Sequence, residues 1–266
     1  MSRLVLFRRV SPNRYGWRIP ARPLLSWVVL LATAAPALTA ASTGGATERA
    51  QYFFDHRHLV PGFTLLAWST LAVFRPTAPV DESALALWCQ VNVELGDDSP
   101  QKADKEHYYR LAVAAAETLR TIYPDDAAGH FWWAAAHGDY ALAQGIPEAL
   151  LALPSVVHEM EHAVALDSSF PLPYAILGIV YRELPSVAGG DWARSKRYFE
   201  AGLGRAPDFT LLRLELARLD IKEGLYGSAR DQLDRLLGTE HPYFESAFVL
   251  NDRPAAESLL TQIRGK

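Results

Sequence analysis

The pattern of apolar and polar residues predicts an all-α protein. From about residue 81 onward, apolar positions recur every three or four residues, in segments separated by short loops that contain Gly, Pro or Asp. This spacing places the apolar side chains on one face of a helix. No segment alternates apolar and polar residues over the length of a strand. We therefore expect helices joined by short loops.

The chain before residue 124 contains three further helical signals. Residues 63–74 are apolar nearly all round, which predicts a helix buried on several sides. Asp81 is expected to cap a helix that ends before Gly96, because Asp favours the first position of a helix and Gly the position after its last turn. The next helix is expected over residues 105–122.

A 34-residue repeat predicts how these helices are arranged. A turn glycine and three inward positions of one helical pair recur at equivalent positions 34 residues later: Gly190, Ser195, Phe199 and Gly202, then Gly224, Ala229, Leu233 and Leu236. This is the tetratricopeptide period, in which stacked hairpins cover one another's apolar faces. We expect a tetratricopeptide-like α-solenoid of about four helical hairpins over residues 80–237. An extra N-terminal helical segment precedes it, and a short helix over residues 254–263 follows.

The distribution of charge sets the first forty residues apart. Residues 1–41 contain six Arg, no acidic residue and an apolar run from Leu24 to Ala41. This order is typical of a secretory signal, with an uncleaved membrane anchor as the alternative. We predict three parts: a signal peptide or anchor over residues 1–41, an N-terminal helical extension over residues 42–100 and the repeat domain over residues 101–266. The protein is then exported and periplasmic.

Removing this leader changes the net charge. The whole chain has 26 Lys and Arg against 30 Asp and Glu, a formal charge of −4; without the six leader arginines it has 20 against 30, or −10. An acidic domain is a poor binder of nucleic acid, which requires a basic face. A protein partner with a basic docking face is favoured instead. Cys89 is the only cysteine, so the chain forms no internal disulfide.

Two segments give the chain a resemblance to a known family. The loop between two repeat helices has the unusual form LP-x-x-x-GGD, and the upstream segment GHFWWAAAHGDYALAQGIPEALLALP precedes it in order. The residues that carry the loop signature are Leu184, Pro185, Gly189, Gly190 and Asp191. With these features the chain resembles the TatT component family of TRAP transporters over roughly residues 100–240.

The resemblance implies a non-enzymatic periplasmic protein with no catalytic residue and no cofactor. It implies association with the solute-binding protein of a TRAP transporter, a trimer, and an apolar cleft for a small apolar or organic-acid ligand. A general tetratricopeptide scaffold in envelope assembly is the alternative without a transport role. The Gly189-Gly190-Asp191 turn could hold an anion at a helix N-terminus, but Asp191 as the helix cap is the simpler prediction.

Aromatic residues of two predicted helices are the candidate wall of that cleft. Their spacing is also that of ordinary helix–helix packing, which remains the competing interpretation. The candidate ligand-binding residues are Trp132, Trp133, His137, Tyr140, Tyr174 and Tyr181.

A second candidate chemistry is metal-dependent hydrolysis. His158-Glu159-x-x-His162 has the H-E-x-x-H form, in which two His on one helix face bind Zn²⁺ and the Glu activates water. Glu161 places a charge inside the motif, and the repeat register directs Met160 inward, which leaves the motif on a solvated face. We therefore assign no metal site and keep a zinc hydrolase only as the alternative function. The polar segment 55–58, DHRH, is expected to be a solvated turn rather than a metal or partner site.

Overall fold

The computed structural model describes residues 43–72 and 81–266, and this part of the chain is helical with no strand. The predicted all-α class is thereby confirmed. The predicted signal peptide or anchor, residues 1–41, lies outside the described residues. Among the helices that are described, none combines the length and the apolar character needed to cross a bilayer.

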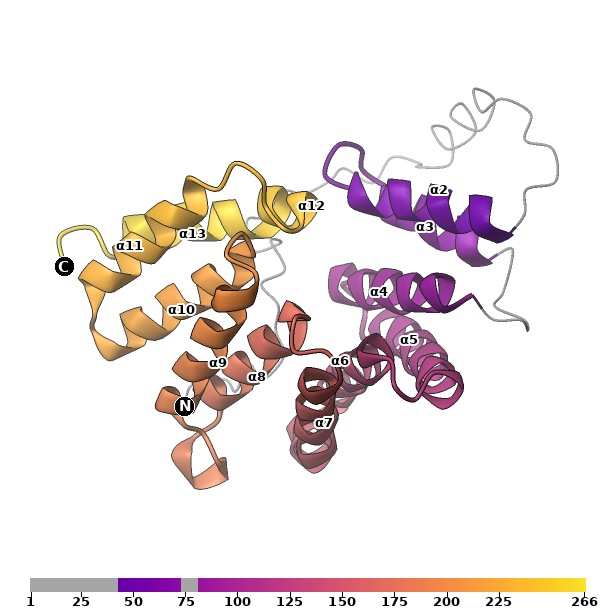
Figure 1. Cartoon of the computed structure of the whole chain (residues 1–266), viewed down its shortest axis with the longest axis horizontal. Helices are drawn as coiled ribbons and strands as arrows, with labels where there is room; N and C mark the ends of the chain where they lie inside the picture. The colour runs from indigo at the N-terminus through magenta and orange to yellow at the C-terminus, as the bar shows by residue number, and fades with distance from the viewer. Residues whose placement is uncertain (1–42, 73–80) are drawn as a thin grey trace.

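Consecutive helices pair as antiparallel hairpins that follow one another along a curved row (Figure 1). The pairs are α2 (Thr43–Asp55) with α3 (Phe63–Ala72), α4 (Glu82–Asp98) with α5 (Lys102–Ile122), α6 (Ala127–Gln144) with α7 (Ile146–Leu166), α8 (Pro171–Glu183) with α9 (Trp192–Arg205), and α10 (Thr210–Glu223) with α11 (Tyr226–Leu237). The short elements are η1 (Ser186–Ala188), α12 (Glu245–Ala247), η2 (Phe248–Asp252) and α13 (Arg253–Gln262). The four hairpins from α4 to α11 are the predicted solenoid, and α2 with α3 is the extra N-terminal segment. The predicted domain boundary at residue 100 lies in the loop between α4 and α5 and remains a prediction.

Side-chain caps explain where several helices begin. Asp81 accepts hydrogen bonds from the backbone N–H groups of Ser83 and Ala84, so the predicted cap of α4 is confirmed. Asp191 accepts from the backbone N–H of Arg194 at 2.9 Å and caps α9. These carboxylates accept hydrogen bonds from backbone N–H groups that have no partner within the helix. An anion at the Asp191 turn would have to displace that carboxylate.

The 34-residue register is visible in the contact between α8 and α9. Ser195 and Phe199 are fully buried, and the Ser195 hydroxyl donates to the Gly178 carbonyl at 2.7 Å. A Cβ atom at Gly178 would lie 2.3 Å from Cε1 of Phe199, so only glycine lets the two helices approach this closely. The equivalent positions one repeat later, Ala229 and Leu233, are also fully buried.

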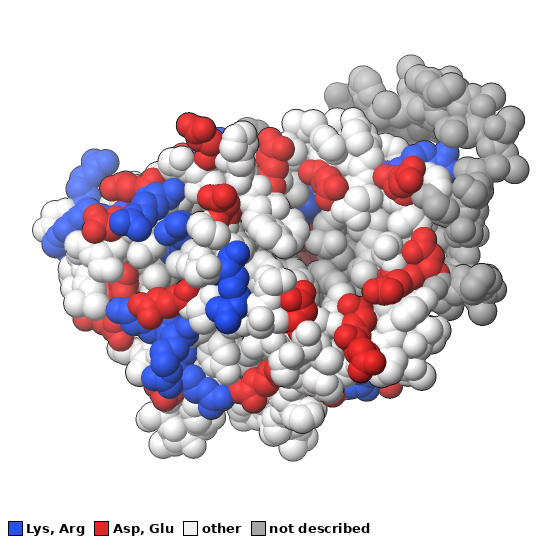
Figure 2. Space-filling view, viewed as in Figure 1, with Lys and Arg blue, Asp and Glu red and all other residues white. Residues whose placement is uncertain are grey.

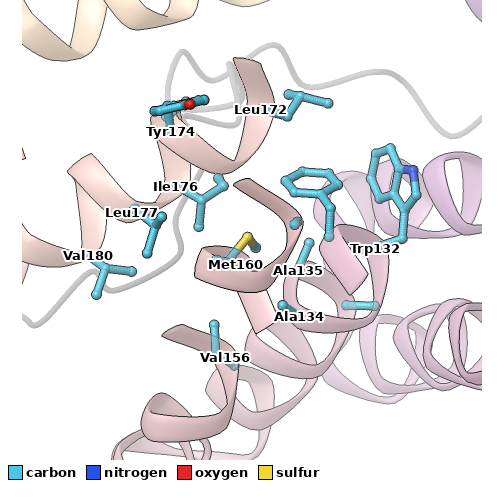
Figure 3. Close-up of a cluster of buried hydrophobic side chains, with 14 of the residues drawn as sticks. Trp132, Ala134, Ala135, Val156, Met160, Leu172, Tyr174, Ile176, Leu177 and Val180 are labelled. Carbon is cyan, nitrogen blue, oxygen red and sulfur yellow. The ribbon is translucent and has the colours of Figure 1, made fainter. Parts of the chain in front are cut away.

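The largest core is continuous from α4 to α10. Figure 3 shows its centre, where Val156 and Met160 of α7 point between Ala135 of α6 and Ile176 of α8. Val156 and Met160 have no exposed surface, as the repeat register predicts. Burial of this apolar surface is the main driving force for stacking one hairpin on the next.

Two sequence-based predictions for the N-terminal helices are wrong. In α3 only Ala67 and Leu71 are buried, and Leu65 is 52% exposed, because this helix packs against α2 and α4 and leaves its other face to solvent. Helix α4 continues past Gly96 to Asp98. Gly96 does not end the helix; a Cβ at this position would overlap the ring of Tyr109 on α5.

Candidate functional site

The curved row of hairpins encloses a cavity of about 440 Å³ between its N-terminal and C-terminal ends. Figure 2 shows the molecule hollowed near the centre of this face, with acidic side chains around the hollow. The cavity is lined by the first helices of successive hairpins, α2, α4, α6, α8 and α10, and by the α12–η2 segment. Its apolar wall is formed by Phe54, Trp132, Leu172, Ile179, Phe209 and Leu214.

Arg57 closes the cavity at the two ends of the row. Its Nε lies 3.2 Å from Oε1 of Glu94, and its Nη1 donates to the Phe54 carbonyl at 2.9 Å. The same Nη1 donates to the Ser246 hydroxyl on α12. The Arg57 side chain is only 8% exposed, so the expectation that residues 55–58 form a solvated turn is wrong at this position. The arginine is buried because its three partners replace water.

The polar wall of the cavity is rich in carboxylates. Asp97 and Asp98, at the end of α4, lie beside Glu94. Partial burial raises the pKa of Asp98 to about 6 although the residue keeps an exposed surface, and the negative charges of Glu94 and Asp97 act in the same direction. A carboxyl with this pKa exchanges its proton in mildly acidic solution.

A buried ion-pair network supports the opposite wall. Glu215 of α10 is 3% exposed and pairs with Arg182 of α8 at 2.5 Å and with Arg218 one turn further along α10. Burial opposes ionisation of Glu215, but the two guanidinium groups outweigh it and lower its pKa. The network therefore fixes α8 against α10 beneath the cavity.

Of the six predicted ligand-binding residues, Trp132 is the one that lines the cavity. Trp133 instead stacks on His137 at 4.7 Å, with the Arg120 guanidinium 4.3 Å from its ring. Burial, followed by the charge of Arg120, lowers the pKa of His137. Tyr140 accepts a hydrogen bond from the Gln144 amide. Trp132 thus faces the cavity, whereas the other candidate residues of α6, Trp133, His137 and Tyr140, do not line it.

Tyr174 and Tyr181 belong to a second aromatic group, at the contact of α7, α8 and α9. Tyr181 stacks in parallel on Tyr198 at 5.7 Å, and Arg194 lies 4.1 Å above Tyr181. Glu161 accepts from Arg194 at 2.5 Å and from the Tyr198 hydroxyl at 3.0 Å. These side chains pack repeats together, and a ligand-binding role for them remains a prediction.

The H-E-x-x-H segment is divided between two environments. His158 and His162 are exposed on α7, as expected. Glu159 instead turns toward α5 and α6, where it pairs with Arg120 at 3.0 Å and with Nδ1 of His130 at 2.6 Å. Burial opposes its ionisation, but the hydrogen bond from His130 and the charge of Arg120 lower its pKa overall. Both oxygens of the carboxylate that would activate water in a hydrolase are thus engaged.

Sequence reasoning misses the arginine that closes the cavity and the carboxylates that make its wall acidic. It places Arg57 in a solvated turn and the Asp97-Asp98 pair in a plain loop. It also misses His130, which pairs with Glu159 outside the cavity and belongs to no sequence motif. A pair of adjacent carboxylates at a predicted helix end is the one available clue, and it becomes informative only once the fold places Glu94 beside it.

Comparison with known proteins gives one family match, over the middle of the chain. Residues 96–214 match the TAtT family, the TRAP transporter T-component. The resemblance inferred from the sequence is thereby confirmed. The T-component segment runs from the end of α4 to the middle of α10, contains the Leu184–Asp191 loop signature and supplies Asp97, Asp98 and Trp132 to the cavity. Arg57 and Ser246, which close the cavity, lie outside it.

One solved structure supports the fold. TTC0263, a thermophilic TPR protein of Thermus thermophilus, superposes with a TM-score of 0.60 at 16% identity, covering 81% of this chain and 99% of that one. MamA gives a TM-score of 0.44 at 13% identity, covering 70% of this chain and 94% of that one. No curated protein matches the chain. The first likeness confirms the predicted tetratricopeptide-like fold.

Proposed function

We propose that this protein is the periplasmic, non-enzymatic T-component of a TRAP transporter and that it binds the transporter's solute-binding protein. The observation that carries the proposal is the family match over residues 96–214, which covers α5, the complete hairpins α6–α7 and α8–α9, and part of the cavity wall. The signal-like leader supports export to the periplasm. Curved helical repeats suit a binding role because they present an extended concave surface.

The distribution of charge favours one side of the molecule for docking. In Figure 2 the acidic residues surround the hollow and continue over the α4–α5 side, whereas Lys and Arg gather over α9 to α11. Complementary charge steers a partner to one face and disfavours the wrong orientation. We infer that the solute-binding protein presents a basic face to the α4–α5 side.

The cavity is proposed to hold a small apolar ligand. Aromatic and aliphatic side chains form much of its lining, as is usual for small-molecule sites. An organic acid is the less favoured alternative, because Arg57 and Arg218 are already paired with Glu94 and Glu215. An added carboxylate would also meet the acidic group at Glu94, Asp97 and Asp98, which repels negative charge.

Affinity capture from the encoding organism tests the proposed partner. The full chain with a C-terminal affinity tag should enrich a TRAP solute-binding protein, identified by mass spectrometry. Asp104→Lys, on the exposed start of α5, should lower this recovery severalfold. Asp231→Lys, an equal charge change on exposed α11, should leave it unchanged. Recovery of envelope-assembly proteins without any solute-binding protein would favour the general scaffold and overturn the proposal.

A further inference from the structure

We propose that His130, Glu159 and His162 form a binding site for a divalent transition-metal ion such as Zn²⁺ at the contact of α6 and α7. Each residue offers one ligand atom, and these atoms all lie within 4.8 Å of one another. Two imidazoles and one carboxylate are a common ligand set for Zn²⁺ and Fe²⁺, and they leave coordination positions open to water.

His130 is prepared to act as a ligand through Nδ1. The ring is buried, and its Nε2 lies 2.8 Å from the Pro124 carbonyl oxygen. A carbonyl only accepts hydrogen bonds, so Nε2 carries a hydrogen. In the neutral ring Nδ1 then has a free lone pair. Metal-binding histidines are commonly oriented in this way, by a second ring nitrogen that donates to a carbonyl.

The hydrogen bond between His130 and Glu159 joins the two atoms that a metal ion would use. Nδ1 of the neutral His130 ring and Oε2 of Glu159 both carry lone pairs, and they lie 2.6 Å apart. Two such atoms repel unless a proton or a metal ion lies between them. A metal ion would replace the proton and use the same two atoms.

Arg120 orients the carboxylate ligand. Its Nη1 holds Oε1 of Glu159 at 3.0 Å, which directs Oε2 toward His130, and its guanidinium lies 4.3 Å from the Trp133 ring. The positive charge of Arg120 opposes a divalent cation and lowers its affinity. The same contact limits rotation of the carboxylate, which reduces the entropy lost on binding.

His162 supplies the adjustable third ligand. It lies one helical turn after Glu159, on the same face of α7, and its ring centroid is 4.3 Å from that of His130. Ligand atoms around tetrahedral Zn²⁺ lie about 3.4 Å apart, so the set must contract. The His162 side chain is exposed and can rotate to do this. Its solvent side leaves room for water as a further ligand.

This ligand set differs from the one that the H-E-x-x-H motif predicts. The motif would use His158 and His162, whose ring centroids are 6.3 Å apart at 61°, and would leave Glu159 free. Here His158 is outside the convergent group, and Glu159 is itself a ligand. The two hypotheses therefore predict opposite results for two exposed histidines on one helix.

Isothermal titration of the EDTA-treated full chain with Zn²⁺ distinguishes them. We expect saturable binding of about one Zn²⁺ per chain, with release of the shared proton shown by a buffer-dependent heat. His162→Ala should weaken binding at least about tenfold, whereas His158→Ala should change it less than about twofold. Both side chains are exposed, so both variants should keep the helical circular dichroism spectrum.

Three results would overturn the proposal. One is no Zn²⁺ uptake by the unsubstituted chain at about 100 μM, a concentration far above the dissociation constants of protein zinc sites. Another is equal weakening in both histidine variants, which would indicate the motif ligands or nonspecific surface binding. The third is binding that survives Glu159→Gln unchanged, since the amide is a poor metal ligand.

Discussion

Arg57 of the turn after α2 donates a hydrogen bond from Nη1 to Oγ of Ser246 on α12, although the two residues are 189 positions apart in the chain. Through this contact the N-terminal hairpin and the C-terminal segment meet beside the cavity. The remaining Arg57 contacts, to Glu94 and Phe54, lie within the N-terminal half. The hydrogen bond to Ser246 is therefore the contact by which Arg57 joins the two ends of the row of hairpins.

Ser246→Ala tests this closure. The substitution removes the α12 partner of Arg57 and leaves the contacts to Glu94 and Phe54 in place. We expect a loss of about 1–2 kcal/mol in the free energy of unfolding, since the hydrogen bond involves a charged donor. Amide exchange of residues 245–252 should become faster. Ser69→Ala, at an exposed serine of α3, is the control; equal exchange in both variants would refute the closing role.

Gly178→Ala tests the close approach of α8 and α9. A Cβ at this position would lie 2.3 Å from the buried ring of Phe199, so the helices must separate or the ring must move. We expect destabilisation of about 1–3 kcal/mol in chemical denaturation. Gly204→Ala on α9 meets no atom within 4 Å and should be neutral or slightly stabilising. A neutral Gly178→Ala variant would contradict the packing described for this contact.

Glu215→Gln tests the ion pair between α8 and α10. The substitution leaves the buried Arg182 guanidinium with Glu183 as its remaining carboxylate partner. Loss of a partner from a buried pair costs about 3 kcal/mol, because the other charge is no longer compensated. Glu106→Gln, which breaks an exposed pair with Lys102 at 3.5 Å, should cost less than about 0.5 kcal/mol. Similar losses in the two variants would show that burial does not matter here.

Asp98→Asn tests the acidic wall through its pH dependence. The pKa of Asp98 is raised to about 6 in the folded protein, so the folded state binds the proton more tightly than the unfolded state does. Its ionisation therefore lowers stability as pH rises from about 4 to 6, and the loss is complete above that range. Asn removes this penalty. At pH 7.5 the variant should melt about 2–4 °C higher, corresponding to about 1 kcal/mol after allowance for solvent screening.

The same comparison has an internal control at low pH. At about pH 4 the Asp98 carboxyl is largely protonated in the folded protein, and the melting temperatures of the two proteins should converge. A stabilisation that is equal at both pH values would instead reflect a change in packing or helix capping.

The repeat contacts were predictable from the sequence because they depend on local spacing. Ser195 and Phe199 lie one turn apart on one helix, and their small-then-large order recurs at Ala229 and Leu233. The end of α4 was not predictable from the same signals. Gly96 has the residue type that ends helices, yet it is retained for close packing against Tyr109. One glycine can satisfy either requirement, and only the neighbouring helix decides between them.

The candidate sites depended on contacts that no local pattern contains. The helical spacing of apolar residues correctly places Glu159 on a helix, α7. Its partners Arg120 and His130, however, belong to α5 and α6. Trp132 and Trp133 are adjacent in sequence and therefore diverge around the helix, which brings only Trp132 into the cavity. The cavity itself follows from the curvature of the whole row of hairpins, and no local sequence pattern predicts that curvature.

Direct titration of the purified full chain with the purified TRAP solute-binding protein of the same organism tests the central claim. We expect a saturable complex that weakens as salt is raised, because complementary charges guide docking. Asp104→Lys should weaken it more than Asp231→Lys. The absence of a complex at about 100 μM of both proteins in low salt, with both proteins folded, would contradict the assignment as a partner of that protein.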